Sequence, residues 1–185
     1  MGALPIRSKH LHVAKSGFNL EPTIRQLTTP EVMIEHYQRL ARAYGIEVVT
    51  KTSGPLDHFT TTYYKTIRLG ADFDEQDPYS QASTWAHEFV HVRQWRQYGP
   101  VIFAGTYVLN GRMGWAFEVQ AYRETMRALH VLGVPEERIQ AYIDGRAERI
   151  WKAYTLIRIA CRKKDVLRYT PEILHEDYDR FRGAA

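Results

Sequence analysis

The segment His87-Glu88-Phe89-Val90-His91 constrains this chain more than any other feature, because it places two histidines four residues apart in a helical context. Residues at that spacing lie on the same face of a helix, so both imidazoles can bind one cation. Glu88 lies one position beyond His87 and can reach a water molecule beside such a cation, where it would act as a general base. The pattern therefore predicts a metal site with hydrolytic chemistry.

Length and composition are those of a single globular domain. The chain has 185 residues, of which 44% are hydrophobic and 25% are charged. The single cysteine, Cys161, excludes an intramolecular disulfide and a cysteine-based zinc site. We find no apolar run of the length that a membrane span needs, and no apolar core of a signal peptide near the N-terminus. We therefore expect no membrane association and a cytoplasmic protein, or a virion protein if the source is a phage.

Positive charge is concentrated late in the chain. The formal net charge is +4, and basic residues are frequent between Arg146 and Arg168. Such a segment could bind nucleic acid, but a solvated helix face followed by a basic turn is the interpretation that we favour.

We expect three segments along the chain. Residues 1–29 are mixed and polar, which predicts an N-terminal arm or irregular cover. Residues 30–160 carry the periodic segments and the motif, and are expected to form the functional domain. Residues 161–185 are expected to form a basic C-terminal tail. Either terminal segment could bind neighbouring protein subunits.

The first half of the domain predicts a helix and two strands. A helix should begin after Thr29 and end at Gly45. Residues 46–52 are rich in β-branched side chains, and residues 58–70 alternate over a longer strand, so the two are expected to form an antiparallel pair. The acidic segment 71–77 lacks the spacing and glycine of an EF-hand, and we interpret it as a surface loop.

The motif lies in a helix that should run from Pro78 to Tyr98. Asp77 is the expected N-cap, and Gly99-Pro100 ends the helix. Apolar residues cover most of its circumference, which predicts a largely buried helix. The remaining stripe is polar and has small side chains one turn before the histidines, which predicts a cleft there; it comprises Ser80, Ser83, Thr84, His87, His91, Gln94 and Tyr98.

Two further long helices are expected downstream. Residues 101–109 are a short apolar stretch, and Asn110-Gly111 predicts a turn. A helix should then run from Trp115 to Leu132, and another from Pro135 to about Ala160.

A catalytic zinc normally has a third protein ligand, and Glu118 is the best candidate. It stands alone among apolar residues near the start of a long helix, and burial of its charge without a cation would be costly. Glu124 is the rival, but neighbouring polar and basic residues suggest that it is exposed to solvent. His130 lies about three turns further along the same helix. Glutamines at positions 94 and 97, where metzincins have glycine and histidine, exclude that class.

With these residues the chain resembles the zincin metallopeptidases of the glutamate-ligand type, the gluzincins, in a small single-domain form. The resemblance covers about residues 57–130 and rests on the HExxH motif and on Glu118 followed by Ala121-Tyr122. It implies an α+β, zincin-like fold, in which a small antiparallel or mixed sheet packs on the motif helix and further long helices. It also implies that the strand at Thr60–Leu69 is an edge strand beside the metal, where it binds an extended peptide. Small zincin-like proteins also occur in bacteriophage genomes.

The expected function is that of a zinc-dependent peptidase. His87, His91 and Glu118 would hold Zn²⁺, and Glu88 would accept the proton of the water that attacks the peptide bond. Tyr122, one turn after Glu118, is the first candidate for stabilising the oxyanion, and His130 and Tyr107 are weaker ones.

Two other functions remain open. The chain could be a zincin-fold structural or assembly protein, for example a phage virion component, with structural zinc or vestigial activity. It could also be a peptidase that associates with nucleic acid through the basic C-terminal segment. The presence of Glu88, which a structural zinc site does not need, favours the enzyme.

Overall fold

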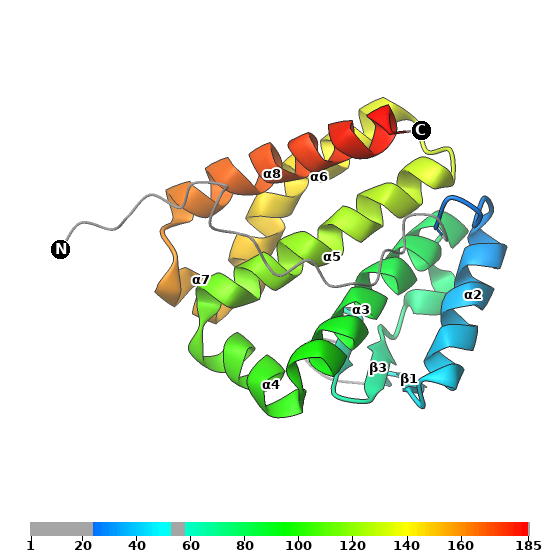
Figure 1. The fold of residues 1–185 in the computed structure, drawn as a ribbon, viewed down its shortest axis with the longest axis horizontal. Coiled ribbons are helices and arrows are strands. Elements are labelled where there is room, and N and C mark those ends of the chain that lie inside the picture. Colours follow the sequence, from blue (N-terminus) through cyan, green and yellow to red (C-terminus); the bar gives the residue numbers. More distant parts are fainter. Residues whose placement is uncertain (1–23, 53–57, 185) are drawn as a thin grey trace.

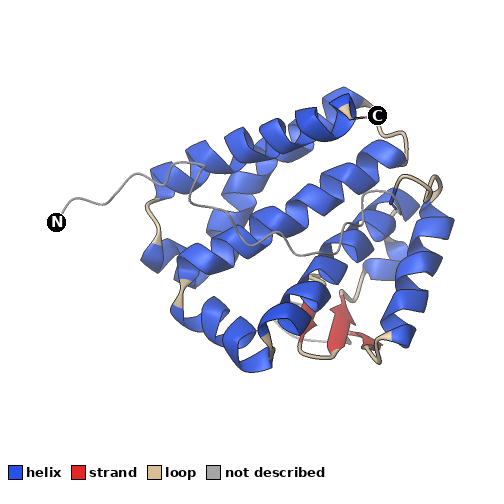
Figure 2. Cartoon of the chain, viewed as in Figure 1, coloured by secondary structure: helices blue, strands red, loops and turns tan. Residues whose placement is uncertain are grey.

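The computed structural model describes residues 24–52 and 58–184, apart from the side chains of 106–109 and 155–156. The fold class is α+β, as predicted: a small mixed three-stranded sheet is followed by several long packed helices (Figure 2). Among the described residues, no helix is both long and apolar enough to cross a membrane.

The sheet differs from the predicted antiparallel pair. After α2 (Pro30–Ala43), which Thr29 caps as expected, β1 (Glu47–Thr50) pairs in parallel with β3 (Thr66–Leu69). The predicted second strand is interrupted: β2 (Thr61–Tyr63) turns at Tyr64, where φ is +54°, and β3 returns antiparallel to it. The prediction of one long strand was therefore wrong. Tyr64 has no side-chain feature that signals a left-handed turn, since asparagine, aspartate and glycine are the usual residues there.

The motif helix is α3 (Pro78–Tyr98), with the bounds that its capping residues predicted. The Asp77 carboxylate accepts hydrogen bonds from the backbone N–H groups of Tyr79 and Ser80, and Gly99 ends the helix with φ of +78°. The acidic segment before it contains one short 3₁₀ helix, η2 (Phe73–Glu75).

The apolar stretch after α3 is a helix, α4 (Pro100–Leu109). The next helix, α5 (Gly111–Val131), begins earlier than Trp115, because the Asn110 side chain accepts a hydrogen bond from the backbone of Met113 and so acts as an N-cap. The turn predicted at Asn110-Gly111 is therefore the capped N-terminus of α5.

The last third of the chain is more ordered than predicted. The expected helix from Pro135 to Ala160 is divided at Tyr154 into α6 (Glu136–Ala153) and α7 (Thr155–Ala160). Residues expected in a loose basic tail form α8 (Lys163–Gly183), which packs against α5 and α6. Several of its basic side chains pair with acids, as Lys163 does with Glu148. This pairing is typical of a structural helix face.

Helix α5 lies between two packed groups of elements (Figure 1). On one side α3 packs against it, with α2 and the sheet beyond; on the other side lie α6 and α8. The buried side chains form two clusters, one centred on α2 and α3 and one shared by α5, α6 and α8. The α3–α5 contact therefore joins the two halves of the core.

We predict that Leu174→Ala, in α8, lowers the free energy of unfolding by about 2–5 kcal/mol, because it leaves a cavity in the second cluster. Glu172→Ala, at an exposed position of the same helix, is the control and should change stability by less than about 1 kcal/mol. Chemical denaturation of both variants measures the difference. Equal stability of the two variants would contradict this contribution of α8 to the core.

Candidate metal centre

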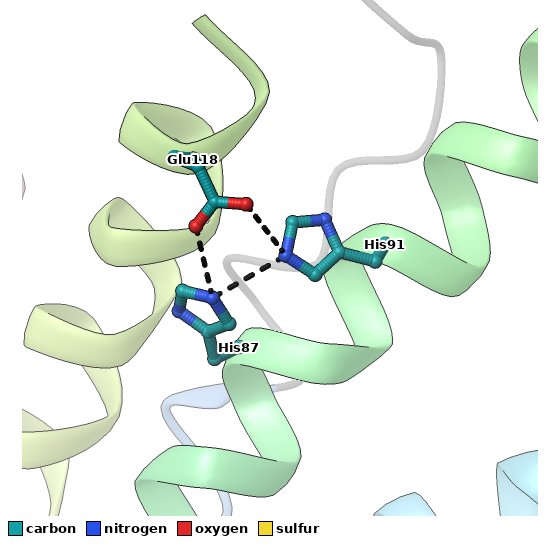
Figure 3. A group of neighbouring side chains, drawn as sticks. All are labelled: His87, His91 and Glu118. Atoms are coloured by element: carbon teal, nitrogen blue, oxygen red, sulfur yellow. Dashed lines mark hydrogen bonds and ion pairs between the residues drawn. The ribbon is translucent and has the colours of Figure 1, made fainter. Parts of the chain in front are cut away.

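Helices α3 and α5 bring together the three residues predicted as metal ligands (Figure 3). The Nε2 atoms of His87 and His91 are 3.3 Å apart. Glu118 Oε2 lies 3.6 Å from His87 Nε2, and Glu118 Oε1 lies 3.5 Å from His91 Nε2. The third candidate ligand therefore comes from the helix that the sequence indicated.

The Glu118 carboxylate is buried, with 1% of the side chain exposed. An ionised carboxylate in such surroundings is costly unless a cation or hydrogen-bond donors compensate it. The two histidines face the carboxylate directly, so a cation bound by them would compensate its negative charge.

The hydrogen bonds of Gln94 determine which nitrogen of His91 is protonated. The Gln94 amide NH₂ donates to the backbone oxygen of Phe117 and to Oε1 of Gln120. Gln94 Oε1 therefore faces His91 Nδ1, at 2.8 Å, and can only accept. His91 Nδ1 must carry the proton, and in a neutral ring the lone pair of Nε2 faces His87 and Glu118.

Thr125 orients His87 in the same way. With its proton donated to the backbone oxygen of Ala121, the Thr125 hydroxyl can accept from His87 Nδ1, which lies 3.3 Å away. The Nε2 lone pair of His87 then also faces the cluster. In metal sites the histidine nitrogen that does not bind the metal commonly donates to such an oxygen.

With both Nδ1 atoms as donors and the rings neutral, three electron-pair-bearing groups converge: the two Nε2 lone pairs and the Glu118 carboxylate. A single divalent cation between these groups would interact favourably with all of them.

The distances also fit a zinc ion. With metal–ligand bonds of about 2.0–2.1 Å, tetrahedral geometry separates neighbouring ligand atoms by about 3.3 Å. The two Nε2 atoms are 3.3 Å apart, and each lies 3.5 or 3.6 Å from one of the two Glu118 oxygens; one ligand atom from each of the three residues lies within 4.8 Å of the others. Two imidazole nitrogens and one carboxylate oxygen are a donor set that zinc accepts, with a fourth position left over.

Glu88 lies beside the cluster without belonging to it. The hydroxyl of Thr62, in β2, donates to Glu88 Oε2 at 2.8 Å. Burial raises the pKa of the Glu88 carboxyl, while His91 and the hydrogen bond from Thr62 lower it. A carboxylate with a raised pKa is a stronger base than an exposed one, so this position suits proton transfer.

A cavity of about 400 Å³ opens beside His87 and Glu88. The small polar residues of α3 line one wall, as the sequence predicted: Ser80, Ser83 and Thr84. Segment 58–60 lines another wall, and α5 and α6 line the rest. The cleft is therefore adjacent to the candidate ligands, and the Glu88 carboxylate faces it.

Two tyrosines contact the centre, and only one of them was anticipated. The ring of Tyr122 packs edge-on against His87, with ring centroids 4.7 Å apart. Tyr154, at the break between α6 and α7, hydrogen-bonds to Glu118. Burial, and then the charge of Glu118, raises the pKa of the Tyr154 hydroxyl, so it remains protonated and donates. The sequence had no signal for Tyr154, because the break that positions it interrupts a helix predicted to be continuous.

The alternative residues lie elsewhere. Glu124 pairs with Arg127 at 3.1 Å and with Arg93 at 3.9 Å, which accounts for its charge. Its side chain is mostly buried rather than exposed to solvent as expected. His130 lies 3.0 Å from the Tyr178 hydroxyl, at the far end of α5. The side chain of Tyr107 lies outside the described residues.

Comparison with known proteins finds no match: no protein-family model, no curated protein and no solved structure matches this chain. The interpretation of the centre therefore rests on its own geometry.

We predict that Thr125→Val lowers zinc affinity by about 10- to 100-fold, because His87 loses the acceptor that orients its ring. Thr170→Val is the matched control: Thr170 is also buried and accepts a hydrogen bond from Trp115 Nε1, but it belongs to α8. Competition with a chromophoric chelator measures both affinities. Equal zinc affinity in the two variants would contradict the role of Thr125.

Proposed function

We propose that the protein is a zinc-dependent peptidase of the zincin type. The observation that carries this proposal is the arrangement of Glu88: a buried carboxylate outside the ligand cluster, at the wall of a cavity that begins at the cluster. A purely structural zinc site needs neither the cavity nor the additional carboxylate.

Each residue has a distinct role in this proposal. His87, His91 and Glu118 hold the ion, with Thr125 and Gln94 fixing the two imidazoles. Zinc bound there would supply a Lewis acid that polarises the peptide carbonyl and lowers the pKa of a water molecule. Glu88 accepts a proton from the attacking water and delivers it to the leaving amine.

Strand β2 is the proposed docking edge for the peptide. The sequence placed an edge strand over Thr60–Leu69, but β3 occupies the centre of the sheet, between β1 and β2. Only the β2 part of that segment is an edge. Among the described strands β2 pairs with β3 alone, and Thr62 links it to Glu88. An extended peptide added to β2 would therefore pass beside the base.

Glu88→Gln tests the reaction directly. The variant keeps the size of the side chain and removes the proton acceptor, so hydrolysis should fall by at least ~100-fold while zinc binding is retained at one ion per chain. A broad peptide library, assayed with zinc-loaded wild type and variant, measures the rate, and elemental analysis measures the metal.

Other outcomes of this experiment are informative. A variant that cleaves as fast as the wild type contradicts the mechanism. A zinc-loaded wild type that cleaves nothing favours the alternative, an assembly protein with structural zinc. Loss of stoichiometric zinc in His91→Ala is the accompanying check on the ligands.

A second experiment identifies the donor that stabilises the oxyanion. We expect Tyr154→Phe, assayed with zinc in excess, to lower kcat by about 100-fold, because it removes a protonated hydroxyl close to Glu118. Zinc affinity should fall as well, because the same hydroxyl hydrogen-bonds to the proposed ligand. Tyr122→Phe should cost less than about 10-fold, because phenylalanine keeps the ring that packs on His87. Steady-state kinetics of both variants make the comparison. The reverse order would assign the role to Tyr122, the residue indicated by the sequence.

A further inference from the structure

Two arginines line the cavity on the wall formed by α6. Arg146 and Arg149 are three residues apart, so they lie on the same face of that helix, one turn from each other. Both contribute to the cavity that contains His87 and Glu88. Two positive charges at this spacing repel each other unless an anion lies between them or nearby.

Arg146 is held in place by aromatic side chains. Its guanidinium carbon lies 3.9 Å from the centre of the Tyr142 ring and 5.6 Å from that of Tyr122. Its Nε donates to the backbone oxygen of Tyr142. These contacts fix the guanidinium plane without neutralising its charge. The guanidinium carbon of Arg149 lies 5.5 Å from the centre of the Phe59 ring, which also lines the cavity.

The acidic residues of α6 do not neutralise this pair. Asp144 is 2.9 Å from His175, and Glu148 pairs with Lys152 and Lys163. Within residues 24–52 and 58–184, neither Arg146 nor Arg149 forms an ion pair with a carboxylate.

The acids that line the cavity belong to α3 and its cap, and each has another partner. Asp77 accepts the hydrogen bonds that cap α3, and Glu88 accepts from Thr62. His58 is 3.4 Å from Asp72. The cavity therefore has positive charge on the part lined by α6 and the proposed base on the part lined by α3.

We propose that Arg146 and Arg149 form a subsite for a carboxylate of the peptide substrate. A fixed guanidinium can bind a carboxylate through two parallel hydrogen bonds, and a second arginine one turn away strengthens the attraction. The carboxylate is either an acidic side chain close to the scissile bond or the C-terminal carboxylate of the peptide. This assignment rests on the proposed peptidase function, but the binding of a peptide can be measured without hydrolysis.

The test uses the zinc-loaded Glu88→Gln protein and three short fluorescent peptides that differ only in charge. One has an internal glutamate and an amidated C-terminus, one has glutamine and a free C-terminus, and one has glutamine and an amidated C-terminus. Fluorescence anisotropy gives the three dissociation constants. We expect one carboxylate peptide to bind roughly 10- to 100-fold more tightly than the neutral peptide, and the tighter one identifies the source of the carboxylate.

Arginine variants in the same background connect this preference to the subsite. Arg146→Gln and Arg149→Gln should each lower the preference for carboxylate by about 10-fold or more. Arg149 is exposed, so its variant should fold even if Arg146→Gln disturbs the tyrosines beneath it. Arg168→Gln is the control, because Arg168 also lies over a tyrosine ring but belongs to α8 and is absent from the cavity.

The outcomes separate this inference from the proposed function. Equal binding of the three peptides, or a preference that survives both arginine variants, overturns the subsite. A carboxylate preference that disappears in both variants supports it, whether or not the wild type cleaves peptides. Cleavage by the wild type without any charge preference would leave the peptidase proposal intact and reject the subsite.

Discussion

The structure depends on the burial of one carboxylate between two helices. Glu118 projects from α5 toward the two histidines of α3, and three electron-pair donors meet there. An uncompensated anion at such a position would weaken the α3–α5 contact, which joins the two halves of the core. Cation binding would therefore stabilise the fold as well as complete the site, since a ligand that binds only the native state raises its stability.

The surroundings of the cluster divide into an orienting part and a reacting part. Gln94 and Thr125 orient the imidazoles through the ring nitrogens that face away from the cluster. Glu88, Tyr122 and the residues of α6 face the cavity. Because orientation and chemistry are assigned to different side chains, variants of the first kind should affect metal affinity, and variants of the second kind should affect turnover.

Sequence reasoning succeeded where the physical signal was local. Capping residues at Asp77 and Gly99 marked the ends of α3, and the four-residue spacing placed His87 and His91 on one face. Glu118 was identifiable because a charged residue in an apolar segment needs a partner. The same reasoning failed for the sheet, because the turn at Tyr64 has no characteristic residue and strand pairing depends on distant contacts. It also missed the packing of α8, whose buried face contacts α5 and α6 rather than its own neighbours in sequence.

The sequence by itself determined the α+β class, the motif helix and the residues able to hold a cation, because helix periodicity and capping act over a few residues. Only the tertiary structure decided which lone pairs face one another, since the protonation of His87 and His91 follows from Thr125 and Gln94. It also decided that Tyr154 and the arginines of α6 meet the same cavity. Those residues are far from the motif along the chain, and their proximity arises from the break between α6 and α7 and from the packing of α6 and α7 against α5.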